Sequence, residues 1–208
     1  MITALEALAR LRDGNRRFVQ SQALPRNVSS GVRRAIQIET QEPFAIILGC
    51  SDSRVPAELV FDQGFGDLFV IRVAGNIVAP SQVGSVEFAA SRFGTRLVVV
   101  LGHSGCGAIV ATLEEVTGRA TSESRNLRSI VDRVRPSVET LLAGRRDRDP
   151  EALIRDAVRA NVRVSVNHLR HGSALLEQLS RTAGLKVIGA EYSLETGVVT
   201  FFENVEDD

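Results

Sequence analysis

The segment IILGCSDSRVPAEL, residues 46–59, decides the fold, because a continuous apolar run ends in it abruptly at Cys50. An apolar run of this length, with Pro43 before it and a turn after it, predicts a strand buried on both faces, as in parallel sheets. The chain then places Asp52 and Arg54 within four residues of the cysteine. Ligands of open parallel sheets gather at the carboxyl ends of the strands. The segment therefore predicts both a sheet of this kind and a functional site at the end of its first strand.

Similar apolar runs recur along the chain and alternate with helical patterns. Strands are predicted over 43–50, 67–73, 96–102 and 185–192, with an antiparallel edge strand in the tail, 198–205. Helices are predicted over 1–20 with a weak interruption at 13–15, over about 30–40 with Ser29 or Ser30 as N-cap, over 81–93 with Ser81 as N-cap, over 105–117, and over 150–182 with Asp149 as N-cap and Pro150 at the first helical position. Residues 118–126 are polar and predict a loop. The alternation predicts an α/β fold whose mostly parallel, doubly wound sheet has four parallel strands and an antiparallel edge strand, flanked by helices.

The chain has 208 residues and shows no internal repeat or linker, so one domain is expected. We predict that this domain, 1–208, consists of an N-terminal helical arm over 1–40 and an α/β core over 41–208. The N-terminal stretch is amphipathic and arginine-rich, but Glu6 and Asp13 and the lack of serine do not fit a transit peptide. We expect it to be part of the fold and the protein to be cytoplasmic.

The composition argues against several classes of partner. Lys and Arg together number 25, as do Asp and Glu, so no net charge favours nucleic acid or an acidic membrane. Tryptophan is absent, and no apolar run approaches the roughly 18 residues that span a bilayer. A small-molecule substrate is expected instead.

Three potential metal ligands follow two of the predicted strands. Cys50 ends the first, and GHSGCG, residues 102–107, ends the third and contains His103 and Cys106. If these strands are neighbours, the three side chains converge, and a Cys-His-Cys set suits zinc while leaving a fourth position for water. The alternatives are two buried cysteines that act as small hydrophobic residues and a histidine that acts as a general base.

Asp52 and Arg54 indicate what kind of zinc site this is. Residues two apart in an extended segment point to the same side, so Cys50, Asp52 and Arg54 could share a face. The arginine would bind the carboxylate, keep it ionised and compete with zinc for it; a surface ion pair without a role is the alternative. A carboxylate that accepts a hydrogen bond from the zinc-bound water favours hydration or hydrolysis of a small electrophile. The neighbouring wall is small and apolar, formed by Phe69, Ala74, Gly75 and Val78.

CSDSRVPAE (50–58), FVIRVAGN (69–76) and GHSGCGA (102–108) resemble the signature segments of β-class carbonic anhydrases, and VIGAEYSLETGVV (187–199) resembles the family's last strands. The resemblance implies one zinc ion per chain on Cys50, His103 and Cys106. It also implies a catalytic dyad of Asp52 and Arg54 that orients the water, and reversible hydration of CO2 to bicarbonate and a proton by zinc-bound hydroxide. Finally, it implies a dimer or a multiple of dimers, with N-terminal helices that pack on the partner.

Further positions follow from the same resemblance. Gln41 matches a glutamine that reaches substrate across the dimer interface, Phe69 matches an apolar pocket position, and Gly107 completes the expected substrate-binding residues. One branch of the family is inhibited by bicarbonate in a second pocket; Arg72 and Tyr192 match that pocket, but Ile47 stands where a tryptophan is needed. We therefore expect a non-allosteric site with water on zinc at neutral pH, with Asp52 as a fourth ligand only in a closed, low-pH state.

Two other functions stay open on the sequence. Carbonyl sulfide and carbon disulfide hydrolases are similar to this family and keep the zinc and dyad motifs. A non-catalytic zinc-binding or oligomeric protein could also keep the fold. His168 and His171, one helical turn apart, are a weaker candidate for a second metal pair.

Overall fold

The computed structural model describes residues 2–22, 38, 41–121, 124–144 and 149–202. Its strands are β1 (Ala45–Gly49), β2 (Leu68–Arg72), β3 (Leu97–His103), β4 (Lys186–Tyr192) and β5 (Val199–Phe201). Its helices are α1 (Ala4–Val19), α3 (Ala57–Val60), the 3-10 turn η1 (Ala74–Asn76), α4 (Pro80–Arg92), α5 (Gly107–Val116), α6 (Arg125–Gly144), α7 (Pro150–His171) and α8 (Ala174–Thr182). The helix predicted near 30–40, with Ser29 or Ser30 as its cap, lies outside the described residues.

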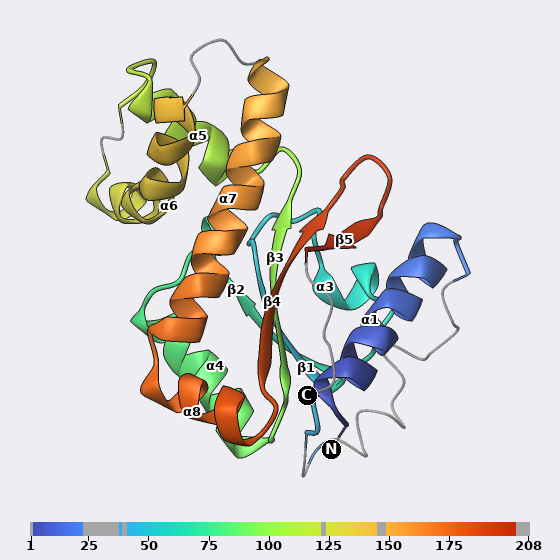
Figure 1. Ribbon diagram of the computed structural model, residues 1–208. Coiled ribbons are helices and arrows are strands. Elements are labelled where there is room, and N and C mark those ends of the chain that lie inside the picture. Colours follow the sequence, from blue (N-terminus) through green and yellow to red (C-terminus); the bar gives the residue numbers. More distant parts are fainter. Residues whose placement is uncertain (1, 23–37, 39–40, 122–123, 145–148, 203–208) are drawn as a thin grey trace.

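The strands form one five-stranded sheet in the order β2-β1-β3-β4-β5 (Figure 1). The first four strands are parallel and β5 is antiparallel to β4, which confirms the predicted sheet. The chain leaves β1 to form β2 on one side and later β3 on the other. The carboxyl ends of β1 and β3 therefore flank the point where the strand order reverses, the usual ligand site of such sheets.

Helices cover both faces of the sheet (Figure 1). α1 and α3 pack on one face, around Leu8, Leu11 and Phe61, all buried. α4, α7 and α8 cover the other face, where Val162, Leu169 and Leu176 are buried. A third apolar cluster joins α5, α6 and α7 to η1 and contains both cysteines. This third cluster lies at the carboxyl end of the sheet and supports the site.

The N-terminal helix α1 packs on its own sheet. A capping box of Thr3 and Glu6 starts it, and its buried face joins the core beneath β1, β3 and β4. Asn15 ties it down further, since its side-chain amide donates to the carbonyls of Val60 and Gly197 and accepts from the Val199 amide. One face of α1 is therefore covered by its own chain, whereas Leu5 and Val19 on the same helix are exposed, and the packing of the N-terminal helices on a partner stays a prediction.

Several predicted helix bounds need correction. The segment 150–182 is two helices, because the first ends at Gly172 and Ser173 caps the second, although Asp149 and Pro150 begin the first as expected. The helix predicted from Ser81 begins one residue earlier, with Ala79 as N-cap.

α6 was not predicted at all. Its sequence is rich in arginine and contains Pro136, which disguises the buried positions Val131, Val134 and Val138. No helix in the described part of the chain is long and apolar enough to cross a membrane.

Candidate active site

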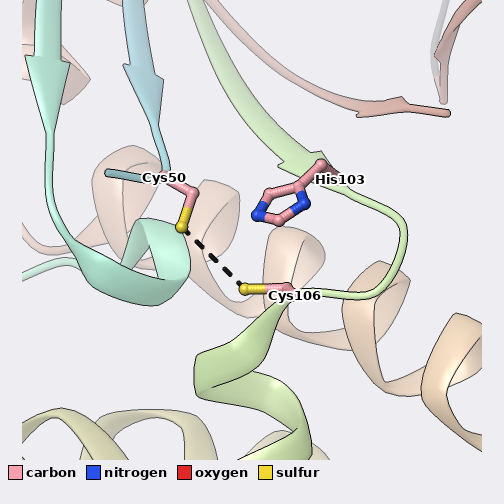
Figure 2. A group of neighbouring side chains, drawn as sticks. All are labelled: Cys50, His103 and Cys106. Carbon is pink, nitrogen blue, oxygen red and sulfur yellow. Dashed lines mark hydrogen bonds between the residues drawn. The ribbon is translucent and has the colours of Figure 1, made fainter. Parts of the chain in front are cut away.

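Cys50, His103 and Cys106 meet at the carboxyl end of the sheet (Figure 2). Cys50 directly follows β1, His103 is the last residue of β3, and Cys106 is the N-cap of α5. Because β1 and β3 are adjacent and parallel, their ends are brought together, as the sequence predicts. The ligand atoms of the three residues all lie within 4.8 Å of one another, and all three residues are buried. No other group of three potential metal ligands occurs among the residues that the structure describes.

The three side chains fit a zinc ion. The Nε2 atom of His103 is buried and has no hydrogen-bond partner in the described structure, whereas Nδ1 lies 3.0 Å from the Ser104 carbonyl oxygen. A partner on Nδ1 fixes the tautomer that leaves Nε2 free for a metal. The two sulfur atoms are 3.9 Å apart. Two thiolates bound tetrahedrally to zinc at about 2.3 Å would be roughly 3.8 Å apart, so the pair needs little movement to bind the ion.

The two thiols influence each other's ionisation in the metal-free protein. Their mutual hydrogen bond lowers the pKa of Cys50 to about 4, helped by contacts with His103 and with the Gly75 amide. The same bond and burial raise the pKa of Cys106 well above its usual range. The pair therefore holds one proton firmly, and a metal that needs both thiolates must displace it.

Asp52 and Arg54 form a two-pronged ion pair beside the cluster. Arg54 Nε donates to Asp52 Oδ1 at 2.9 Å and Nη2 to Oδ2 at 2.7 Å. These hydrogen bonds hold the pKa of the Asp52 carboxyl well below its usual range. Asp52 Oδ2 also lies 3.8 Å from His103 Nε2, so the carboxylate faces the position of the metal. The carboxylate is therefore ionised and shared between the arginine and the metal site.

The geometry that joins Asp52 and Arg54 differs from the expected extended strand. Residues 53 and 54 form a turn, in which the Arg54 amide donates to Asp52 Oδ1 at 3.0 Å and the Val55 amide to the Asp52 carbonyl at 3.0 Å. The arginine reaches its partner because the chain turns back, and not because alternate residues share a face.

The three residues expected to bind substrate are not brought together within one chain. Gly107 is exposed at the start of α5, directly after Cys106. Phe69 is near the start of the edge strand β2, level with Ile46 of β1, and its ring lies 6.3 Å from that of Phe88 and 6.0 Å from that of Phe93. Gln41 is exposed and precedes β1, at the amino end of this strand, whereas Cys50 follows its carboxyl end. Only Gly107 of the three therefore borders the cluster in its own chain.

The residues that match the bicarbonate pocket have other contacts. Ile47 and Tyr192 are buried in the core beneath α1. Arg72, at the end of β2, donates to the carbonyls of Cys50 and Asp52. His168 and His171 end α7, and His171 Nδ1 lies 3.8 Å from Glu177 Oε1, without a third ligand in the described structure.

Two residues that support the metal ligands were not predicted from the sequence, Ser104 and Arg72. The Ser104 amide donates to the Tyr192 carbonyl and its hydroxyl accepts from the Leu194 amide, which fixes the carbonyl that faces His103. The contacts of Arg72 with the loop after β1 were also missed. The aligned ends of β1 and β2 are a signal that could have found them, because Arg72 pairs with Gly49, next to Cys50.

Comparisons with known proteins agree with a metal site formed by these residues. The family model described as "Carbonic anhydrase" matches residues 45–199, which include the five residues of the cluster and the ion pair. Carbonic anhydrase 2 of Mycobacterium tuberculosis is 38% identical over 188 residues, with 90% of this chain and 87% of that protein covered. The carbonic anhydrase of Mycolicibacterium smegmatis is 37% identical over 198 residues, with 95% and 92% covered. This chain belongs to the β-class carbonic anhydrase family.

The fold agrees with this membership. The solved structure of the β-carbonic anhydrase CcaA superposes with a TM-score of 0.75 at 26% identity, covering 97% of each chain. A β-carbonic anhydrase of Aspergillus fumigatus, CafA, gives a TM-score of 0.75 at 22% identity, covering 97% of this chain and 91% of that one, and shows the same fold. Carbonate dehydratase activity follows for this chain from its family and its relatives, and the Cys50–His103–Cys106 cluster fits the zinc that this activity needs.

Proposed function

We propose that this protein is a zinc-dependent enzyme that hydrates CO2 reversibly to bicarbonate and a proton. The observation that carries the proposal is the buried His103 Nε2, which has no hydrogen-bond partner in the described structure and lies in reach of two thiols and of an ionised aspartate. Cys50, His103 and Cys106 would hold the zinc ion. When bound, zinc acts as a Lewis acid that lowers the pKa of a water molecule.

Asp52 and Arg54 govern the attacking water. Asp52 Oδ2, which faces His103 Nε2, would accept a hydrogen bond from the attacking water and so orient it toward CO2. Arg54 keeps the carboxylate ionised and, through its two hydrogen bonds, would compete with zinc for it. The Asp52–Arg54 pair supports our expectation that the site stays open to water at neutral pH. The absence of bicarbonate allostery is expected for another reason, namely that Ile47 stands where the second pocket needs a tryptophan.

A small, uncharged substrate fits the surroundings of the cluster. A cavity of about 370 Å³ begins at Ala74 and Gly107 and continues between α5 and α6. Its lining is mostly apolar, with Ala108, Leu127 and Ile130, and Glu114 and Glu115 also border it. Of the candidate site residues only Gly107 lines this cavity, so the cavity supplies a mostly apolar surface beside the cluster, which suits a small, uncharged molecule.

The same features fit carbonyl sulfide and carbon disulfide, so the substrate needs a direct test. We would measure CO2 hydration with a pH indicator and sulfide release from carbonyl sulfide on one preparation with one zinc per chain. Fast CO2 turnover with little sulfide release is the expected result. Sulfide release without CO2 turnover would move the protein to the hydrolase branch. No turnover of either substrate would favour a non-catalytic zinc protein.

We also propose that the protein acts as a dimer or a dimer of dimers in the cytoplasm. Gln41 could reach a metal centre only in a second copy of the chain, because in its own chain it lies at the amino end of β1, away from the cluster at the carboxyl end. Solved β-carbonic anhydrases of Sordaria macrospora are described as tetrameric, and they share the fold with a TM-score of 0.72 at 21% identity, covering 95% of this chain and 97% of that one. Sedimentation of the zinc-loaded protein tests this point.

A further inference from the structure

Arg72 ends β2 at the place where its ladder with β1 stops. Arg72 is level with Gly49, and the next amide, that of Val73, still donates to the Gly49 carbonyl at 3.1 Å. Beyond Gly49 the chain leaves the sheet to form the loop that carries Cys50 and Asp52. The backbone carbonyls of this loop have left the ladder and need other donors.

The Arg72 guanidinium supplies those donors. Its Nε atom donates to the Cys50 carbonyl at 3.0 Å, and its Nη2 atom donates to the Asp52 carbonyl at 2.6 Å. One planar, permanently charged group thus joins the backbone of a metal ligand to that of the dyad carboxylate. Only arginine offers two donors in such a fixed fork, since the lysine ammonium is a single nitrogen on a flexible stem.

The same loop is held at few other points. The Gly75 amide lies 3.4 Å from Cys50 Sγ, and the Val55 amide donates to the Asp52 carbonyl that Arg72 also contacts. The backbone of Asp52 is therefore fixed at its carbonyl group. The side chain extends from this fixed backbone, and its carboxylate binds Arg54. A change at Arg72 would release the backbone from which both side chains start.

We propose that Arg72 is a positioning residue, which bridges the Cys50 and Asp52 carbonyls and so aims both the thiolate and the carboxylate at the metal. The part of this proposal that concerns Asp52 rests on the proposed function, whereas the part that concerns Cys50 does not. Arg72 touches neither the cluster's ligand atoms nor, in our account, the substrate. Its loss should therefore lower zinc affinity and kcat and leave KM nearly unchanged.

The test uses Arg72→Met in the wild-type and Asp52→Asn backgrounds, with Arg181→Met as control. The control substitution also removes one positive charge, but Arg181 is exposed on α8, where its guanidinium lies 3.9 Å from the Glu177 carboxylate. We expect Arg72→Met to weaken zinc binding, measured by competition with a chelator, about 10- to 100-fold, and to lower kcat by a similar factor. With Asp52→Asn present, its effect on kcat should shrink to less than about threefold, because the carboxylate that it positions is gone.

Each outcome decides one part of the proposal. Zinc affinity and kcat equal to those of Arg181→Met would overturn it entirely, and the same full loss of kcat in the Asp52→Asn background would overturn the positioning of the carboxylate. If Arg72→Met does not fold, Arg72→Lys replaces it, and a wild-type zinc affinity for Arg72→Lys would count against the bridge. If zinc-loaded wild type does not hydrate CO2, the proposed function fails, and zinc affinity alone still decides whether Arg72 positions Cys50.

Discussion

Asp52 lies between a metal site and an arginine, and this position explains its proposed role. Its side chain is 16% exposed, its carboxylate accepts hydrogen bonds from Nε and Nη2 of Arg54, and one of its oxygens faces His103. Asparagine has nearly the same shape but cannot be an anion that accepts two charged donors. The substitution therefore removes the charge that orients the water and leaves the three metal ligands untouched.

We predict that Asp52→Asn keeps about one zinc per chain and loses roughly 10²-fold or more in kcat for CO2 hydration. Metal analysis and stopped-flow rates on the same samples check this. A variant that keeps more than half of the wild-type rate would show that the carboxylate does not govern the water.

The pKa values of the thiols predict how zinc affinity depends on pH. Cys50, with its pKa lowered to about 4, is already a thiolate near neutrality, whereas Cys106, with its raised pKa, keeps its proton until zinc displaces it. Zinc binding should therefore release this proton, and the affinity should rise with pH, by about tenfold per unit between pH 6 and 8. Chelator competition at several pH values measures the slope, and an affinity independent of pH would contradict the account.

At the scale of the elements, α1 shows how one glycine fixes a helix on the core. A Cβ atom on Gly14 would lie 1.8 Å from the Phe61 carbonyl oxygen, so a side chain cannot fit unless α1 moves. Gly84 in α4 is also helical, but a Cβ atom there meets nothing within 4 Å. The two helical glycines therefore form a matched pair with opposite expectations.

Gly14→Ala should destabilise the protein by about 1–3 kcal/mol or more, because it overpacks the contact with α3. Gly84→Ala should stabilise it by up to about 1 kcal/mol, because alanine favours the helix. Thermal unfolding of both variants beside wild type measures the difference. Equal melting temperatures would mean that α1 is not held at Gly14 as described.

The elements also show how much could be predicted from the sequence. The strands and the meeting of Cys50, His103 and Cys106 were predictable, because buried parallel strands appear as apolar runs and their carboxyl ends lie on the same side of the sheet. Helix α6 could not be predicted, since arginines surround its few buried positions. The packing of α1 on its own sheet could not be predicted either, because an apolar helix face does not reveal what it packs against. The turn that returns Arg54 to Asp52 depends on backbone geometry that the residue types leave open.

At the scale of the whole molecule, the metal ligands join separate parts of the chain. They connect the ends of β1 and β3 to the start of α5, within the apolar cluster that also includes Val134 of α6 and Val158 of α7. A bound ion should therefore stabilise the folded protein by RT ln(1 + [L]/Kd), about 4 kcal/mol when free zinc exceeds Kd by 1,000-fold. We predict that chelation lowers the melting temperature by several degrees, in wild type and in Asp52→Asn alike. An unchanged melting temperature after complete removal of zinc would contradict the site.

The most direct test of the central claim is a zinc titration of the metal-free protein, with the CO2 hydration rate measured by stopped flow at each step. Our account predicts a rate that rises in proportion to bound zinc, reaches its plateau at one ion per chain, and is not restored in Cys106→Ala. A fully zinc-loaded protein that hydrates CO2 no faster than buffer would contradict it.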